Sequence, residues 1–367
     1  MNLTPLEARQ VIRHLKAGVF PPLGIDQFTF GRRAEVATIQ EALDTAVAGR
    51  SKGIFLEADY GHGKSHMLKF IEYSALAQGF AVSWIILDVK NHAFNHPARY
   101  LHSFLENIKV AETPLRGLCN LVPFWMNNGQ KQSLLKYADS GAPSWFGNAI
   151  LGQANGYSIS DPDHYYSRAL EARDIKYRSG WSSHQGVYDR MKSLAQLCRA
   201  AGLKGVVFLF DEIESVAVLY NRLSRTAAYS VLSTLLDPDE FPHFCFFFAA
   251  TPDFRSKLKS EEEAYIYSPS AASFIKKWIN GKHCVLPLPR LSKSQNGELL
   301  RKLRSLHEHA FTWKAADRVT DELIAEIVQV AHNQSLTERE LIKSFVTILE
   351  ICQQNPDYRP VITSEEG

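Results

Sequence analysis

The stretch that decides the fold reads Ile54-Phe55-Leu56-Glu57-Ala58-Asp59-Tyr60-Gly61-His62-Gly63-Lys64-Ser65. Its apolar first half predicts a buried strand over residues 53–57, and the apolar spacing over 65–76 predicts a helix after the glycines. A strand, a loop ending in Gly-Lys-Ser and a helix form the context in which this pattern binds the phosphates of a nucleotide. The alternative, a glycine-rich turn before an ordinary helix, is disfavoured because both flanks fit.

The loop supplies what a bound triphosphate needs, namely converging backbone N–H groups, a mobile cation and a hydroxyl for Mg²⁺. Gly61 and Gly63 lack a Cβ and let the backbone wrap the β-phosphate. We expect Lys64 to reach the β- and γ-phosphates and Ser65 to bind the metal, at the positive end of the helix. Ala58 replaces the usual first glycine of the pattern, which is compatible with the turn if its φ is negative.

A second apolar run, over residues 206–210, ends in Asp211-Glu212. A buried strand of this kind delivers a carboxylate to the phosphate edge of a sheet, where Asp211 is expected to hold the Mg²⁺ shell. Glu212 is then placed to polarise the attacking water as a general base. The alternative is an acidic strand end that leads into a helix N-terminus.

Two further polar residues complete the candidate catalytic set. Thr251 follows a phenylalanine-rich run over 243–250, a position from which it could sense the γ-phosphate, although threonine before proline is common at strand ends. Thr337 and Glu340 predict a capping box, which puts Arg339 in the first turn of a helix. A cation there opposes the helix dipole, and this indicates that a phosphate outweighs the cost.

Composition excludes several classes of protein. The chain has 367 residues, is 45% hydrophobic and carries a net charge of +2, so nucleic-acid binding would need a local patch. No stretch approaches the length of a membrane span, and we expect no export signal, no membrane contact and a cytoplasmic location. The absence of a Cys-x-x-Cys pair argues against a zinc site and a secreted disulfide framework. The five cysteines are Cys119, Cys198, Cys245, Cys284 and Cys352.

Alternating helix and strand signals predict a three-layer α/β fold with a parallel central sheet, followed by a small all-helical domain. This organisation resembles a P-loop NTPase (ASCE/AAA-like), and the resemblance implies that the helical domain is a lid. The expected organisation is N-terminal helices and an adenine-side Gly-Arg segment over 1–50, a core over 51–288, a lid over 289–356 and a tail over 357–367. Within the core, about 110–180 is predicted to be an insertion that is helical only at its start and end. Its aromatic residues fit a partner surface, but burial is the commoner outcome.

Together these segments resemble AAA/STAND-like P-loop ATPases near the origin-recognition and initiator branch. The resemblance rests on Phe30-Gly31-Arg32-Arg33-Ala34-Glu35, the loop over 58–65, Asp211-Glu212-Ile213-Glu214, Thr251-Pro252 and Thr337-Glu338-Arg339-Glu340-Leu341. More narrowly, the loop Asp-Tyr-Gly-x-Gly-Lys-Ser-His and the Asp-Glu-Ile-Glu segment resemble the ATP-binding proteins of BREX-type bacterial phage-defence systems. The resemblance covers most of residues 1–355, and no motif matches within 110–180.

The resemblance implies a role for each matching position. Thr251 corresponds to sensor 1 and Arg339 to sensor 2, while Lys64 and Glu212 act with them in catalysis. Ser65 and Asp211 would bind Mg²⁺. The residues implied in ATP binding are Gly31, Arg32, Ala58, Gly61, His62, Gly63, Lys64, Ser65 and His66.

Such ATPases often complete the site with an arginine from a neighbouring subunit, which implies a homo-oligomer that forms or tightens with ATP. The candidates are Arg225, Arg222 and Arg255. Arg225 is preferred because it precedes a helix expected over 227–236, and a solvated surface arginine is the alternative for each.

Three functions stay open at this stage. The first is an ATP-hydrolysing switch or motor that acts on a helicase, nuclease or methyltransferase subunit in antiviral defence, and Glu212 favours it. The second is a nucleotide-dependent assembly scaffold, and the third is a small-molecule kinase. Residues 276–314 carry a positive excess that fits DNA, although such a run is usually a solvated helix face.

Overall fold

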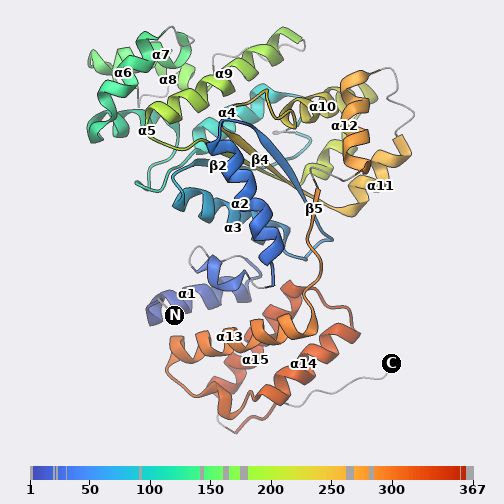
Figure 1. The fold of residues 1–367 in the computed structure, drawn as a ribbon. Coiled ribbons are helices and arrows are strands. Elements are labelled where there is room, and N and C mark those ends of the chain that lie inside the picture. Colours follow the sequence, from blue (N-terminus) through green and yellow to red (C-terminus); the bar gives the residue numbers. More distant parts are fainter. Residues whose placement is uncertain are drawn as a thin grey trace. The chain divides into compact units, whose positions relative to one another are not determined.

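The chain folds into two compact units in a computed structural model (Figure 1). The first, here called the lid unit, comprises Met1–Val36, Ala58–Phe70 and Pro287–Gly367, and the second, the sheet unit, comprises Ala37–Glu57 and Ile71–Leu286. The structure describes residues 3–19, 21, 24–29, 31–90, 93–140, 144–159, 165–173, 181–261, 268–280, 285–355 and 357–360.

A five-stranded sheet in the order β2-β3-β4-β1-β5 forms the centre of the sheet unit. β4 pairs in parallel with both β1 and β3, and β2 pairs in parallel with β3, which confirms the predicted parallel sheet. β4, which the phenylalanine-rich run over 243–250 predicts, lies between β3 and β1. The strands are β1 (Lys52–Glu57), β2 (Ala81–Ile86), β3 (Val206–Asp211), β4 (Phe244–Ala250) and β5 (Val285–Pro287).

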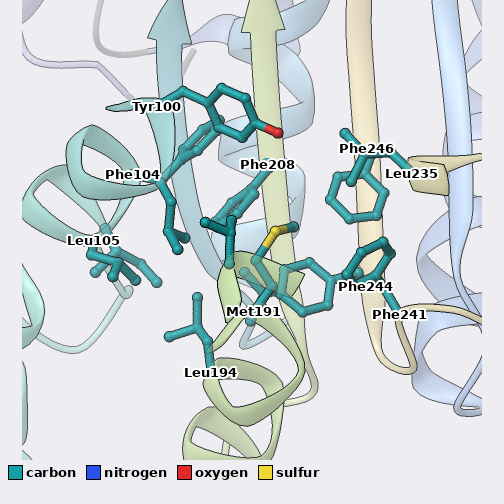
Figure 2. Packing of buried hydrophobic residues seen from close by; sticks show 14 of the residues in the cluster. Tyr100, Phe104, Leu105, Met191, Leu194, Phe208, Leu235, Phe241, Phe244 and Phe246 are labelled. Carbon is teal, nitrogen blue, oxygen red and sulfur yellow. The ribbon is translucent and has the colours of Figure 1, made fainter. Parts of the chain in front are cut away.

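One face of the sheet carries stacked phenylalanines. Phe104 of α4 lies flat on Phe208 of β3 (Figure 2), with ring centroids 3.9 Å apart. Phe210 of β3 stacks on Phe248 of β4 at 4.8 Å. Met191 of α9 lies on the same side (Figure 2). Because side chains alternate along a strand, every second residue of β3 and β4 faces this aromatic layer, and the phenylalanine-rich sequence follows from it.

The opposite face of the sheet is covered by α2, where the Cys245 thiol donates to the carbonyl of Ala42 at 3.0 Å. Helices on both faces make the three layers predicted from sequence. The helices around the sheet are α2 (Arg33–Val47), α3 (Lys64–Ala77), α4 (Pro97–Asn107), α9 (Trp181–Ala200), α10 (Arg222–Leu235), α11 (Pro252–Glu261) and α12 (Pro269–Asn280). No helix of the described residues has the length and apolar character needed to cross a membrane.

The insertion is helical through its middle, so the expectation of helix only at its two ends was wrong. Phe146, Ala149 and Ile150 follow a helical spacing and are buried. Gly152, which suggests a loop, faces the Tyr166 ring so closely that a Cβ would collide with it. Glycine therefore lets two helices approach. The elements are α5 (Leu118–Trp125), a π-helical turn (Met126–Gln130), α6 (Lys131–Asp139), α7 (Ser144–Ala154) and α8 (Tyr165–Leu170).

Aromatic residues of the insertion are mainly buried where the structure describes them. Trp125, Tyr137 and Phe146 lie in the core of the sheet unit, whereas Tyr157 is half exposed. The commoner of the two expected outcomes, burial, therefore holds for these three rings.

The lid unit combines helices from distant parts of the sequence. α1 packs against α13 and α15, and Val11, Ile12 and Leu15 share one core with Leu303 and Phe345 (Figure 1). The capping box of Thr337 and Glu340 is confirmed. The elements are α1 (Pro5–Lys16), the 3-10 turns Ile25–Phe28 and Ala315–Asp317, α13 (Lys293–Phe311), α14 (Asp321–Asn333) and α15 (Glu338–Gln354).

His307 is fully buried in this helical core. Trp313 donates its indole N–H to Nδ1 of His307 at 2.9 Å, so the neutral ring carries its proton on Nε2. Burial lowers the pKa of His307 to about 4, and the Glu350 carboxylate opposes that shift only in part. The fold therefore favours the neutral ring.

We expect this histidine to make the lid unit acid-sensitive. Its folded pKa lies below the ordinary 6.5, so the unfolded chain takes up the proton first as the pH falls. The contribution of neutral His307 to the free energy of unfolding is fully present above about pH 6.5 and declines toward pH 4. Roughly 1 to 2 kcal/mol of it is lost at pH 5. Urea unfolding of the wild type and of His307→Gln at pH 7 and pH 5 measures this loss of stability.

The glutamine introduced by this substitution does not titrate, so the variant should lose less stability over this pH range than the wild type. His332→Gln is the matched control, since His332 is exposed on α14. An equal loss in His307→Gln and the wild type would contradict the prediction.

Candidate nucleotide-binding site

The loop after β1 has the backbone that a phosphate cradle requires. Gly61 and Gly63 have φ of +82° and +89°, a left-handed conformation that side chains disfavour. Ala58 does not have a positive φ, so alanine is compatible with the first position of the loop pattern. Lys64 is buried and donates its ammonium to the carbonyls of Ala58 at 2.8 Å and Asp59 at 3.3 Å.

The start of α3 follows at once, because Lys64 is its first residue. Its N-terminal N–H groups lack partners within the helix and present a partial positive charge at the loop. Ser65, half-buried in the first turn, is therefore placed where a hydroxyl can approach a metal that accompanies the phosphates.

At the end of β3, Asp211 is 6% exposed and accepts the N–H of Glu212 on Oδ1 at 3.1 Å. Glu212 is exposed and has φ of +61° and ψ of +45°, which sequence reasoning did not foresee. Its side chain makes no capping hydrogen bond to the short 3-10 helix Ile213–Val218. The acidic pair therefore does not act as a helix cap there.

The sheet order brings the ends of β3, β4 and β1 side by side at one edge. Glu57, the last residue of β1, pairs with Ala250 of β4, and Thr251 follows directly. Thr251 is half-buried, and its carbonyl accepts the N–H of Phe254 at 3.1 Å at the start of α11.

Arg225 and Arg255 have side-chain partners within the chain. Arg225 lies 3.4 Å from a Glu261 oxygen and donates to the carbonyl of Leu219 at 3.0 Å. Arg255 lies 2.9 Å from Glu57. Arg222 is exposed. A role in trans for any of the three stays a prediction.

The helix expected over 227–236 begins earlier, at Arg222, so the expectation that Arg225 precedes it was wrong. Asn221 is the N-cap, and its side chain accepts the N–H of Ser224 at 2.8 Å. Asparagine is a strong N-cap, so Asn221 is the signal in the sequence that marks the start of α10.

The segment expected at the adenine side lies within the lid unit. Gly31 has φ of +63°, and its carbonyl accepts the amide of Gln295 from α13 at 3.2 Å. Arg32 is buried and paired with Glu35 at 3.4 Å.

His66 lies 3.0 Å from the hydroxyl of Thr29, which itself donates to the carbonyl of Ile25 at 2.9 Å. The ring therefore donates from Nε2 to Thr29. Burial and then the charge of Arg32 lower the pKa of His66 to about 4, which keeps the ring neutral.

Residues at the loop apex contact the start of α15, and sequence reasoning missed this. The Arg339 guanidinium lies 5.5 Å from the centre of the Tyr60 ring, and His62 Nε2 lies 3.8 Å from a Glu338 oxygen. Neither Tyr60 nor Glu338 was a candidate, because the sequence indicates a phosphate near Arg339 but carries no signal for these two side chains.

A parallel sheet in which β4 separates β3 from β1, with a Gly-Lys-Ser loop after β1, defines a P-loop NTPase of the AAA-like class, followed by a helical lid. The sequence model described as "BREX system ATP-binding protein BrxC/D" matches residues 3–145 and 170–366. The chain belongs to this family.

Two solved structures are similar in broad outline. One is the Walker-type ATPase PABY2304 of Pyrococcus abyssi, at 14% identity and a TM-score of 0.41, covering 89% of this chain and 69% of that one. The other is the ORC2 protein of Aeropyrum pernix in ADPNP–ADP complexes, at 14% identity and a TM-score of 0.38, covering 92% and 70%. No curated protein matches the sequence.

We expect the left-handed conformation of Glu212 to cost stability. Glu212→Gly should raise the free energy of unfolding of the sheet unit by about 1 kcal/mol, because glycine adopts positive φ without a Cβ clash. Urea denaturation of the two proteins measures the difference. Glu214→Gly is the control, since Glu214 is not among the residues with positive φ, and it should destabilise. If Glu212→Gly destabilised as much as the control, the strain would be absent.

Proposed function

We propose that this ATP-binding protein hydrolyses ATP with Mg²⁺ and serves as a switch or motor in antiviral defence. The observation that carries the proposal is the strand order, since β4 lies between β3 and β1 and sets the ends of all three strands at one sheet edge. In P-loop ATPases the phosphate loop, the metal carboxylate and the water-orienting groups come from such neighbouring strand ends.

Each residue has a defined part in the proposed reaction. Lys64 neutralises the β- and γ-phosphates, and Glu212 polarises the attacking water. Thr251 orients the γ-phosphate and the water by hydrogen bonding, and Arg339 stabilises the charge that develops on the transferred group. The exposed side chain of Glu212, free of a capping bond, supports its assignment as the base.

The residues present suit Mg²⁺. Asp211 provides a buried carboxylate, and Ser65 provides a hydroxyl at the first turn of α3. No group of three or more His, Cys, Asp or Glu side chains within the described ranges could hold a metal alone. Mg²⁺ commonly takes one or two protein ligands together with substrate phosphates and water, so two protein ligands are enough here. The metal would neutralise phosphate charge as it develops.

Two substitutions separate binding from hydrolysis. Lys64→Ala should abolish ATP binding, whereas Glu212→Gln should keep it and lower turnover by roughly a hundredfold or more. Equilibrium binding of ATP and the rate of phosphate release measure the two effects. Lys136→Ala and Glu112→Gln are matched controls, because both are exposed residues of the insertion and neither belongs to the candidate site.

The result also distinguishes the scaffold from the ATPase. A wild-type chain that binds ATP tightly and releases no phosphate would favour a nucleotide-dependent assembly platform. Equal turnover in Glu212→Gln and the wild type would remove Glu212 as the base. Transfer of phosphate to a metabolite rather than to water would favour the third function, a small-molecule kinase.

The basic residues of 276–314 support an accompanying proposal, that DNA contacts this region and stimulates hydrolysis. Several of these cations lie exposed, among them Arg290, Lys302 and Lys314. Arg301 and Arg304 pair with Asp321 at 3.2 Å and 2.8 Å, and these pairs reduce the free positive charge. The remaining excess would contact phosphates without reading sequence.

We expect duplex or single-stranded DNA to raise the ATPase rate at low salt and to lose this effect at high salt, because phosphate contacts release counterions. Rates with and without DNA at two salt concentrations test it. Lys302→Ala should weaken the stimulation, and Lys136→Ala should not. If DNA left the ATPase rate unchanged at both salt concentrations, the basic residues of 276–314 would be a solvated helix face and not a DNA-binding region.

A further inference from the structure

Three consecutive residues at the apex of the phosphate loop contact three consecutive residues at the start of α15. Tyr60 lies beneath Arg339, Gly61 faces Thr337, and His62 faces Glu338. A Cβ at Gly61 would lie 2.9 Å from Cγ2 of Thr337, so the backbone of the loop touches the cap of the helix. All six residues belong to the lid unit. We call this set the apex contact.

The lid side of the apex contact is held in place by its own hydrogen bonds. Thr337 accepts the N–H of Glu340 at 3.2 Å, and Glu340 accepts the N–H of Thr337 at 2.8 Å. Glu338 accepts the N–H of Leu291 on Oε1 at 3.0 Å. The carboxylate of Glu338 therefore has a fixed position, and its Oε2 is left for the loop.

The loop side of the apex contact is also held by a hydrogen bond of its own. The Nδ1 of His62 lies 3.0 Å from the carbonyl of Tyr60 and donates to it. His62 Nε2 and Glu338 Oε2 are both buried and, among the described residues, without a hydrogen-bond partner, while 3.8 Å separates them. This distance exceeds a hydrogen bond, and the Nε2 lone pair cannot donate to a carboxylate, so the two atoms form a close contact that a small movement of either element would change.

The side chains of Tyr60 and His62 are not needed to form the phosphate-binding loop. Backbone N–H groups and the two glycines wrap the phosphates, and small residues would serve that purpose. The Tyr60 ring is 72% exposed, yet Arg339 lies over it and reaches its hydroxyl at 3.4 Å. An exposed tyrosine in this position is best explained by its arginine partner.

We propose that Tyr60 and His62 are positioning residues through which the lid follows the occupancy of the phosphate loop. This inference rests on the proposed nucleotide binding. A triphosphate attracts the Arg339 guanidinium away from the Tyr60 ring, and it repels the neighbouring Glu338 carboxylate from His62. The two adjacent and opposite charges on α15 thus respond together, and the start of the helix moves with the nucleotide.

Hydrogen exchange at the first turns of α15 tests the proposal in the full chain, with and without the slowly hydrolysed analogue ATPγS and Mg²⁺. In the wild type, the analogue should change the exchange of amides 338–342. The double variant Tyr60→Leu with His62→Gln, measured at a concentration of the analogue that saturates the variant's own site, should lose this change. Tyr60→Phe keeps the ring and should retain most of the response.

Matched controls remove the same residue types elsewhere. Tyr73→Leu and His332→Gln replace exposed residues of α3 and α14 and should leave the response intact. A second measurement is a double-mutant cycle of Tyr60→Leu and Arg339→Leu on the affinity for ATPγS. The two effects should deviate from additivity by about two- to fivefold, the range expected for an exposed cation–π contact.

The outcomes separate this inference from the proposed function. A wild-type chain that binds no analogue would overturn both. A chain that binds it, but shows the same exchange at 338–342 with and without it, would overturn the coupling alone. A full response in the double variant, or additive effects in the cycle, would also overturn it, because the lid would then sense nucleotide without Tyr60 and His62.

Discussion

The parallel pairing of β4 with both β1 and β3 is the constraint on which the rest of the structure depends. Once these three strands lie side by side and point the same way, their carboxyl ends must share one edge of the sheet. Glu57, Asp211 and Ala250 end these strands, so residues that are almost two hundred positions apart reach one edge. In the sequence, the glycine loop, Glu212 and Thr251 each follow one of these ends. The phenylalanine stack across β3, β4 and α4 holds this pairing by burying large rings on one face.

The sequence carried enough information for the sheet and for most of the candidate site. Continuous apolar runs predict buried parallel strands, because both faces of such strands are covered, and Gly-Lys-Ser after the first of them fixes the phosphate loop. Helix caps can also be predicted from sequence, because a capping box involves residues only three positions apart. Thr337 and Glu340 are an example. In each case the signal lies within a few residues of the feature that it predicts.

What could not be read from the sequence depends on tertiary contact. The middle of the insertion is helical, and Gly152 is a helix position where the Tyr166 ring approaches closely. Glu212 has a left-handed backbone that no propensity rule predicts for glutamate. The partners of Tyr60 and His62 lie more than 270 residues away, so nothing local to the loop could indicate them.

The place of α1 in the lid unit has a consequence for how the chain acquires its structure. α1 buries its apolar face against α13 and α15, and residues 17–292 intervene between α1 and α13. Closing so long a loop delays the contact, because the entropy must be lost before the buried surface is gained. During synthesis Val11, Ile12 and Leu15 therefore lack their final partners until α13 and α15 have emerged, so α1 is made long before it can pack.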